Sequence, residues 1–239
     1  MASSLFLSDL HLGETRPEAN ERFFSFIEDT AAKAGAVYIL GDLFEYWIGD
    51  DDLEEPFHAL IAGFLRNLSR GVPLFVMRGN RDFLMGERFS AATGARMLDD
   101  PTVVDAGGVP TLLMHGDTLC TDDGDYQEWR KLAHSETWQR EFLAQPLSRR
   151  RDTMNALREK SKKALKSKPA EIMDVNPGAV RDAFRRSGAV RLIHGHTHRP
   201  GSEMLEVDGR RCERWVLPDW YGSGGYLELA GARPKLLQF

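Results

Sequence analysis

The chain of 239 residues is long enough for one large domain or for a core with an insertion. Its hydrophobic fraction of 42% and charged fraction of 28% are those of a globular protein, and a net charge of −5 excludes a general attraction to nucleic acid or anionic lipid. No secretory signal and no run of roughly 18 apolar residues is visible, so we expect a cytoplasmic protein. Cys120 and Cys212 lack CxxC spacing, which favours free thiols over a disulfide.

Short apolar segments alternate with helical patterns in the first 80 residues. Residues 5–7, 37–40 and 73–77 are rich in β-forming residues and predict buried strands. Apolar residues recur at helical spacing between Pro17 and Gly35 and between Pro56 and Gly71, and we expect Gly35 to end the first helix in the left-handed conformation. This alternation predicts parallel βαβ units and an α/β fold.

The pattern changes in the second half of the chain. A hairpin with Gly107-Gly108 at its turn is predicted over 102–114, and a helix after Pro177 leads into a strand at 190–193. We expect the short β-like pieces of 203–239 to be antiparallel strands that complete a second sheet. The polar, helical section between these parts predicts an insertion. The predicted division is a core of 1–122 and 171–239 with a helical lid at 123–170.

Residues that can bind metal follow five of the predicted strands. Each alone has a structural explanation, such as an aspartate in a turn. Together they matter, because ligand sites form beyond the carboxyl ends of strands in α/β sheets. Imidazole, carboxylate and amide donors without cysteine suit divalent ions such as Mn²⁺, Fe²⁺ or Zn²⁺, and seven donors suit two ions better than one. The candidate ligands are Asp9, His11, Asp42, Asn80, His115, His196 and His198.

This set resembles the binuclear metallophosphoesterases of the calcineurin-like superfamily. Their motifs D-x-H, G-D, G-N, an isolated H and G-H-x-H match the chain in that order. The resemblance implies an αββα sandwich of two mixed sheets flanked by helices, with a helical lid insertion. It implies that one ion is held by Asp9, His11, Asp42 and His198, and the other by Asp42, Asn80, His115 and His196. Asp42 would then bridge the ions, and the catalytic residues would be Asp42, Asn80, His115 and His196.

One residue departs from the superfamily pattern. Many relatives have histidine, a possible general acid, directly after the asparagine, whereas this chain has Arg81. Arginine does not donate a proton at neutral pH, but it binds phosphate through two hydrogen bonds. A phosphate that leaves from a pyrophosphate needs little protonation. Arg81 therefore favours a pyrophosphate substrate over an ordinary ester.

Four longer segments, 41–52, 79–84, 115–123 and 172–176, resemble the UDP-2,3-diacylglucosamine diphosphatase family. The resemblance implies hydrolysis of UDP-2,3-diacylglucosamine to UMP and 2,3-diacylglucosamine 1-phosphate by water activated by two Mn²⁺ ions, in lipid A biosynthesis. It also implies a peripheral protein on the cytoplasmic face of the inner membrane of Gram-negative bacteria. The family's substrate contacts fall on Asn80, Arg81, Asp123, Ser161, Lys168 and His196, and a further polar contact falls on Leu165. The alternatives are a metallophosphoesterase for another nucleotide or phosphodiester, and a scaffold that has lost catalysis.

The insertion leaves several interpretations open. Its apolar residues, such as Trp129 and Phe142, either pack helices together or line a groove for acyl chains. Nine basic and two acidic residues between 148 and 168 fit a solvated helix face, an anionic membrane surface or a nucleic-acid patch. No aromatic-rich motif supports nucleic acid, and no heptad pattern suggests an oligomer, so we expect a monomer without a nucleic-acid partner. Trp47 and Tyr126 are expected to line the substrate site, and His58, His134 and His194 to be structural.

Overall fold

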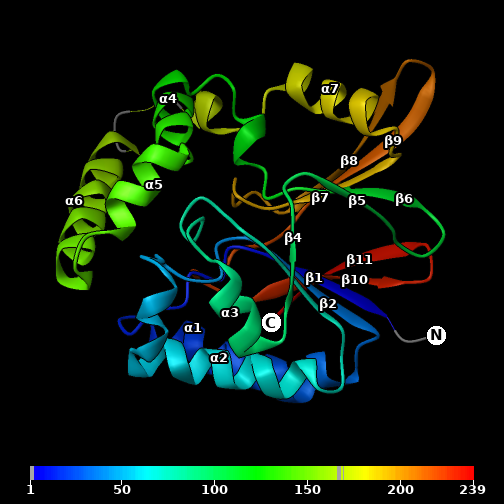
Figure 1. Cartoon of the computed structure of the whole chain (residues 1–239). Coiled ribbons are helices and arrows are strands. Elements are labelled where there is room, and N and C mark those ends of the chain that lie inside the picture. Colours follow the sequence, from blue (N-terminus) through cyan, green and yellow to red (C-terminus); the bar gives the residue numbers. More distant parts are fainter. Residues whose placement is uncertain (1–2, 166–167, 169) are drawn as a thin grey trace.

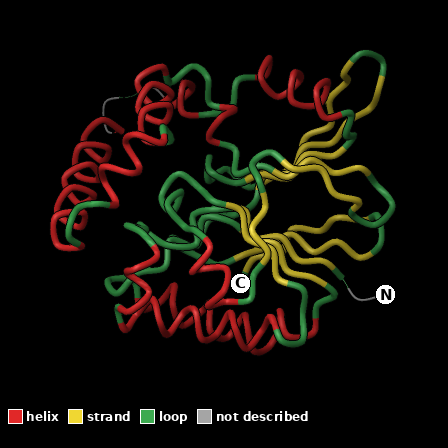
Figure 2. Tube along the Cα trace, in the orientation of Figure 1, coloured by secondary structure: helices red, strands yellow, loops and turns green. Residues whose placement is uncertain are grey.

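Two mixed β-sheets lie face to face, with helices on the outer face of each, and this arrangement confirms the predicted fold (Figure 1; Figure 2). The computed structural model describes residues 3–165, 168 and 170–239. The first sheet has the order β11-β10-β1-β2-β3-β4 and the second the order β5-β6-β7-β9-β8. In chain order, β1 to β11 span Ser4–Leu7, Ala36–Leu40, Leu74–Met77, Arg96–Leu98, Thr102–Asp105, Pro110–Leu113, Arg191–His194, Gly201–Val207, Arg210–Val216, Gly225–Ala230 and Arg233–Gln238.

Helices cover both outer faces of the sheets. Helices α1 (Pro17–Asp29), α2 (Pro56–Ser69) and α3 (Glu87–Thr93) lie on the first sheet, and α7 (Pro177–Ser187) lies on the second. Proline stands at the first position of α1, α2 and α7, where its missing N–H costs nothing. Within the described residues, no helix combines the length and the apolar character that a membrane span requires.

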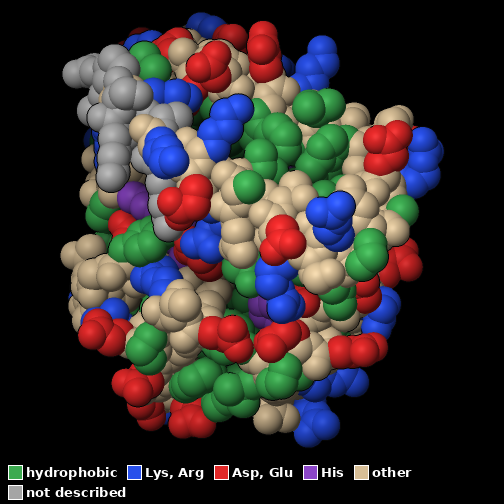
Figure 3. All heavy atoms as spheres, turned by 90° about the vertical axis from the view of Figure 1, so that its left-hand side faces the viewer, with side chains coloured by type: hydrophobic (Ala, Val, Ile, Leu, Met, Phe, Trp, Pro, Cys, Tyr) green, Lys and Arg blue, Asp and Glu red, His purple; other side chains and the backbone are tan. Residues whose placement is uncertain are grey.

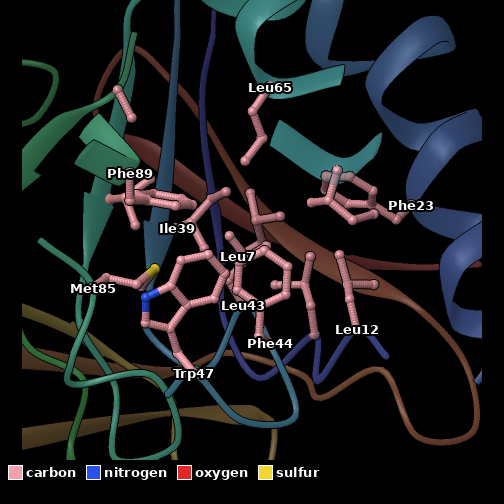
Figure 4. Packing of buried hydrophobic residues seen from close by; sticks show 14 of the residues in the cluster. Leu7, Leu12, Phe23, Ile39, Leu43, Phe44, Trp47, Leu65, Met85 and Phe89 are labelled. Atoms are coloured by element: carbon pink, nitrogen blue, oxygen red, sulfur yellow. The ribbon is translucent and has the colours of Figure 1, made fainter. Parts of the chain in front are cut away.

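Side chains point alternately to the two faces of each strand, so the buried residues of the first sheet belong to two apolar clusters, one on each face. In β1, Leu5 and Leu7 point to the helices of the first sheet, while Phe6 belongs to the cluster between the two sheets. Figure 4 shows Ile39 of β2 in the helix-side cluster with Phe23 of α1. Both faces of the central strands are therefore buried, so the polar residues of these segments are confined to the strand ends.

Two expectations about the fold are wrong. Gly35 does not take the left-handed conformation, because α1 ends earlier in a 3₁₀ turn (η1, Ala31–Lys33) and the chain leaves that turn in extended form at Ala34. The C-terminal strands also do not all join the second sheet. Strand β10 pairs antiparallel with β1, so the last hairpin completes the first sheet. Alternation predicts such hairpins but does not tell which free sheet edge each one joins.

The insertion folds into helices at one side of the two sheets, on the left in Figure 1. Helix α4 spans Gly124–Ala133, α5 spans Glu136–Leu143 and α6 spans Leu147–Leu165. Trp138 packs on Phe142 with ring centroids 4.8 Å apart and lies 6.0 Å from Phe83 of the core. Leu132 is 53% exposed. Most of the apolar residues thus pack the helices together and onto the core, and a minority stay open.

Candidate active site

All seven candidate ligands gather at one edge of the two sheets, just beyond the ends of β1, β2, β3, β6 and β7. Four of them are buried, with exposed fractions between 0% and 2%: Asp9, His11, Asp42 and His115. Asn80, His196 and His198 are partly exposed. The strand order brings segments from position 9 to position 198 together, as the rule for strand ends predicts.

Asp9, His11 and His198 form one donor group. Their ligand atoms all lie within 4.8 Å of one another. His198 Nε2 is 3.2 Å from Asp9 Oδ1 and 3.3 Å from His11 Nε2. Asp42 joins this group through Oδ2, which is 3.9 Å from His11 Nε2. These distances suit donors that converge on one cation.

Asn80, His115 and His196 form a second group beside it. The amide oxygen of Asn80 is 2.9 Å from both His115 Nε2 and His196 Nδ1. Asp42 Oδ1 is 3.7 Å from His115 Nε2, so its two oxygens face the two groups. Asp9, Asp42 and His115 also have ligand atoms within 4.8 Å of one another, which places Asp9 close to both groups.

The backbone is strained where these residues converge. Asp9, His11, Asp42, His196 and His198 have φ angles between 49° and 67°, in the left-handed region that disfavours side chains. They are five of the six non-glycine residues with positive φ in the described part of the chain. Each such residue costs about 1–3 kcal/mol, and strain of this kind is concentrated at functional sites. The strain thus independently marks five of the seven predicted ligands.

Two glycines allow the ligand loops to approach each other. A Cβ atom at Gly41, whose φ is 91°, would lie 2.5 Å from His115 Nδ1. One at Gly79 would lie 2.2 Å from Asp42 Oδ1. The buried carboxylate of Asp82 fixes the same loops, since it accepts hydrogen bonds of 2.7 Å from the backbone N–H groups of Gly79 and Leu43. Asp82 is not among the predicted site residues, because its only signal in the sequence is an acidic residue in the turn after Asn80.

The electrostatics of the site favour added positive charge. Burial raises the pKa of Asp42 to about 7, with a further contribution from the charges of Asp82 and Asp9. Burial would lower the pKa of His115, but Asp42, Asp9 and Asp117 raise it to about 9. Carboxylates crowded in a buried place stabilise a nearby cation. With oxygen and imidazole donors and no thiolate, the residues fit divalent metal ions.

Known proteins resemble this chain in amino-acid sequence over nearly its whole length. Residues 3–200 match the family model of the calcineurin-like phosphoesterases. A UDP-2,3-diacylglucosamine hydrolase of Aromatoleum aromaticum is 47% identical over 234 residues, which are 98% of this chain and 96% of that protein. One of Chromobacterium violaceum is 44% identical over 226 residues, 94% and 93% of the two chains. The chain belongs to the UDP-2,3-diacylglucosamine hydrolase family of the calcineurin-like phosphoesterases. It is a metal-dependent hydrolase, as the sequence predicts.

A cavity of about 690 Å³ in this phosphoesterase lies between α4, α6 and the loop after β3. Five of the six predicted substrate contacts line it: Asn80, Arg81, Asp123, Ser161 and Lys168. The sixth, His196, is not part of the lining, although its ring centroid is 5.8 Å from that of Tyr126, which is. Phe83, Trp129, Leu132, Met154 and Leu157 give the cavity apolar walls. It thus begins beside the donor groups and becomes apolar toward the lid.

Two predicted substrate contacts of the hydrolase bind each other. Lys168 Nζ is 2.5 Å and 2.7 Å from the carboxylate oxygens of Asp123. Asp123 also caps α4, because it accepts a hydrogen bond from the backbone N–H of Tyr126. The side chain of Leu165, where the family has a polar contact, lies outside the described residues.

The basic run of the lid is only partly a surface feature. Arg150, just 2% exposed, binds Asp51 and donates to the carbonyl oxygen of Ile48 at 2.6 Å. Arg151, Arg158 and Lys168 pair with acidic residues in the same way. Arg149, Lys160 and Lys163 are exposed. Figure 3 shows basic, acidic and hydrophobic side chains interspersed on this side. Among the described basic residues of this run, four therefore bind within the protein and three are exposed, so only part of the run is available to solvent or to a membrane surface.

Of the two aromatic residues that were expected to line the substrate site, Tyr126 does so and Trp47 does not. Trp47 does not line the cavity of the hydrolase: it is 0% exposed and packs against Phe44, His58 and Phe89, as Figure 4 shows for the two phenylalanines. Tyr126 does line it. His58 and His194 are buried and belong to neither donor group, in keeping with a structural role. His134 stacks on Phe83 and forms part of the cavity wall.

Proposed function

We propose that the chain hydrolyses the pyrophosphate bond of UDP-2,3-diacylglucosamine and releases UMP and 2,3-diacylglucosamine 1-phosphate, a step of lipid A biosynthesis. The main support is the cavity, which joins a polar end beside the donor groups to apolar walls. This distribution of polar and apolar lining residues matches a substrate with a charged pyrophosphate and long acyl chains. The two relatives named for this substrate are 47% and 44% identical to the chain over the aligned residues.

The proposed cofactor is a pair of Mn²⁺ ions. Asp9, His11, Asp42 and His198 would hold one ion, and Asp42, Asn80, His115 and His196 the other. Bound there, the ions would activate a water molecule and neutralise charge on the attacked phosphoryl group. The strained loops would fix the donors before the substrate arrives, so little reorganisation would be needed. No serine or cysteine nucleophile is required.

Arg81 is the proposed phosphate clamp. It lines the cavity, and its guanidinium makes no hydrogen bond or ion pair with another residue in the part of the chain that is described. Its donors are therefore free to bind a phosphoryl oxygen pair. His196 and Asn80 would bind the same group, while Asp123, Ser161 and Lys168 would contact the sugar and acyl part. The Lys168–Asp123 pair must then exchange partners or admit the substrate beside it.

The proposal also includes the division of the chain into a core and a lid, and the location of the protein in the cell. Residues 1–122 and 171–239 would form the catalytic core and 123–170 the lid over the acyl chains. A monomer would sit on the cytoplasmic face of the inner membrane without crossing it, and no nucleic acid would take part. The exposed basic residues Arg149, Lys160 and Lys163 support this, together with the exposed Leu132 and Leu143 of the lid.

The test is an assay of metal-free protein with UDP-2,3-diacylglucosamine, scored by UMP release before and after Mn²⁺ is added. We expect release only with the metal. A simple aryl phosphodiester is the comparison substrate. Hydrolysis of that ester without UMP from the glycolipid would favour another phosphodiesterase. No hydrolysis of either would favour a scaffold without catalysis.

A further inference from the structure

The segment after Asp42 carries much of the family resemblance but contributes no metal ligand. Three of its acidic residues instead hold helix α6 of the lid. Asp51 binds Arg150, Asp52 binds Arg151 and Glu45 binds Arg158. Asp51 and Asp52 belong to the 3₁₀ turn η2 (Asp50–Glu54), whereas Glu45 lies closer to the donor groups. Of these three acidic residues, Glu45 is the one that also lies close to a candidate metal ligand, His11.

The backbone places Glu45 beside the loop of His11. Leu12 and Phe44 form a parallel β-bridge, and the backbone N–H of Glu45 donates to the carbonyl oxygen of Leu12 at 2.9 Å. The Glu45 side chain is mostly buried. Its Oε1 accepts from Arg158, and its Oε2 accepts a hydrogen bond of 3.2 Å from the hydroxyl of Tyr221. Both carboxylate oxygens are therefore fixed.

His11 presents an unsatisfied nitrogen to this carboxylate. Its Nε2 faces Asp9, Asp42 and His198, so this is the atom that would bind a cation. Its Nδ1 is buried and has no hydrogen-bond partner within the described residues, and it lies 3.6 Å from Glu45 Oε2. An imidazole that binds a metal through Nε2 carries its proton on Nδ1. Metal-binding histidines commonly donate that proton to a carboxylate, which fixes the ring and strengthens the ligand.

We propose that Glu45 is a positioning residue that orients His11 through Nδ1 and at the same time holds Arg158 in the cavity wall. This rests on the proposed metal-dependent hydrolysis. Arg158 lines the cavity, so one carboxylate connects the wall of the substrate site to a metal ligand. The ring of Tyr221 stacks on His11 with centroids 4.8 Å apart, and its hydroxyl donates to Glu45, so Tyr221 contacts both residues of the pair.

The primary test measures the affinity of metal-free protein for Mn²⁺ by competition with a chelator, which needs no turnover. Loss of such a carboxylate typically weakens metal binding about 10–100-fold, so we expect this for Glu45→Ala. Glu45→Gln keeps an acceptor oxygen and should fall between Glu45→Ala and the wild type. Asp51→Asn is the matched control, because it weakens the neighbouring anchor of α6 without touching a candidate ligand. Its metal affinity should equal that of the wild type.

Kinetics provide the second readout. Arg158→Met should raise KM for the glycolipid and weaken Mn²⁺ binding less than Tyr221→Phe does, because Arg158 holds Oε1 of Glu45 whereas Oε2 is the oxygen that faces His11. Glu45→Gln should change both quantities. Tyr221→Phe removes the hydroxyl that fixes Glu45, so it should weaken metal binding by a smaller factor even if the Glu45 variants fail to fold.

Two results would overturn the assignment. One is wild-type metal affinity in folded Glu45→Ala, or in Tyr221→Phe if the Glu45 variants do not fold. The other is an equal loss in Asp51→Asn, which would mean that loosening the lid alone weakens the metal site. Failure of the proposed function looks different, because the wild-type protein itself would then bind no Mn²⁺ or release no UMP.

Discussion

The ligand loops are held by hydrogen bonds to main-chain groups, whereas helix α6 is held mainly by ion pairs between side chains. At the ends of β1, β2 and β7 the donors sit on strained backbone, and buried Asp82 ties the loops after β2 and β3 together. Helix α6 instead binds the core through Arg150, Arg151 and Arg158, each paired with an acidic residue.

This difference separates two kinds of function. Donors fixed in this way cannot shift without moving a strand, so under the proposed function they would be in place before a substrate arrives. Ion pairs at a partly exposed surface are weaker, so under the proposed function α6 could adjust its position to a flexible acyl substrate. The two regions meet at Glu45, which contacts both His11 and Arg158.

The largest effect is expected from Asp42→Asn at the centre of the ligand loops. Asp42 directs one oxygen to each donor group, so the amide should remove most metal binding and activity together. Loss of several kcal/mol of metal-ion stabilisation lowers the rate by about a thousand-fold or more. Chelator competition and UMP release measure the two effects. Near-normal activity of the Asp42→Asn variant in Mn²⁺ would show that Asp42 is not the bridge.

The second prediction compares a glycine that the ligand loops require with a glycine elsewhere that can be replaced by alanine. Gly79→Ala would place Cβ 2.3 Å from the backbone nitrogen of Asp42, which should cost about 2–3 kcal/mol in the free energy of unfolding. Gly63→Ala in α2 is the control, since no atom lies within 4 Å of its Cβ position. It should stabilise the helix by about 0.5–1 kcal/mol. Denaturant unfolding distinguishes the two. Equal effects would mean that the ligand loops tolerate rearrangement.

The two regions also differ in how far the sequence predicts them. The convergence of the candidate ligands was predictable because each follows a short apolar strand, and parallel strand ends meet at one edge. The anchors of α6 were not, since Arg149, Arg150 and Arg151 are identical in type and only the fold decides that Arg150 is buried. Its partner Asp51 lies 99 residues away. Trp47 was misassigned for a related reason: its burial depends on His58 and Phe89, which no local pattern connects to it.

A third prediction concerns the anchor of α6 and its dependence on pH. Asp51→Asn should lower the free energy of unfolding by about 1 kcal/mol at pH 7, less than a hydrogen bond to a buried charged group, because the Asp51 side chain is 45% exposed and solvent weakens the pair. The hydrogen bond from Arg150 lowers the pKa of Asp51, so the contribution is present above the carboxyl's unfolded pKa of about 3.9 and is lost as the pH falls through the lower folded value. Unfolding curves of both proteins from pH 7 to 2.5 should converge at the acidic end. A constant difference would mean that the ionised pair is not the cause.

The smallest expected effect tests whether the open part of the lid serves the acyl chains. Leu132 lines the cavity and is 53% exposed, so serine there should change the free energy of unfolding by no more than about 0.5 kcal/mol. If an acyl chain covers this surface, the loss of about 1 kcal/mol of apolar contact should raise KM for the diacyl substrate about fivefold and leave kcat unchanged. Leu60→Ser on α2 is matched in exposure, at 49%, but lies away from the cavity. It should leave KM unchanged. Because the ligand loops are untouched in both variants, a KM effect confined to Leu132 would assign the apolar wall to substrate binding, whereas equal KM values would place the acyl chains elsewhere.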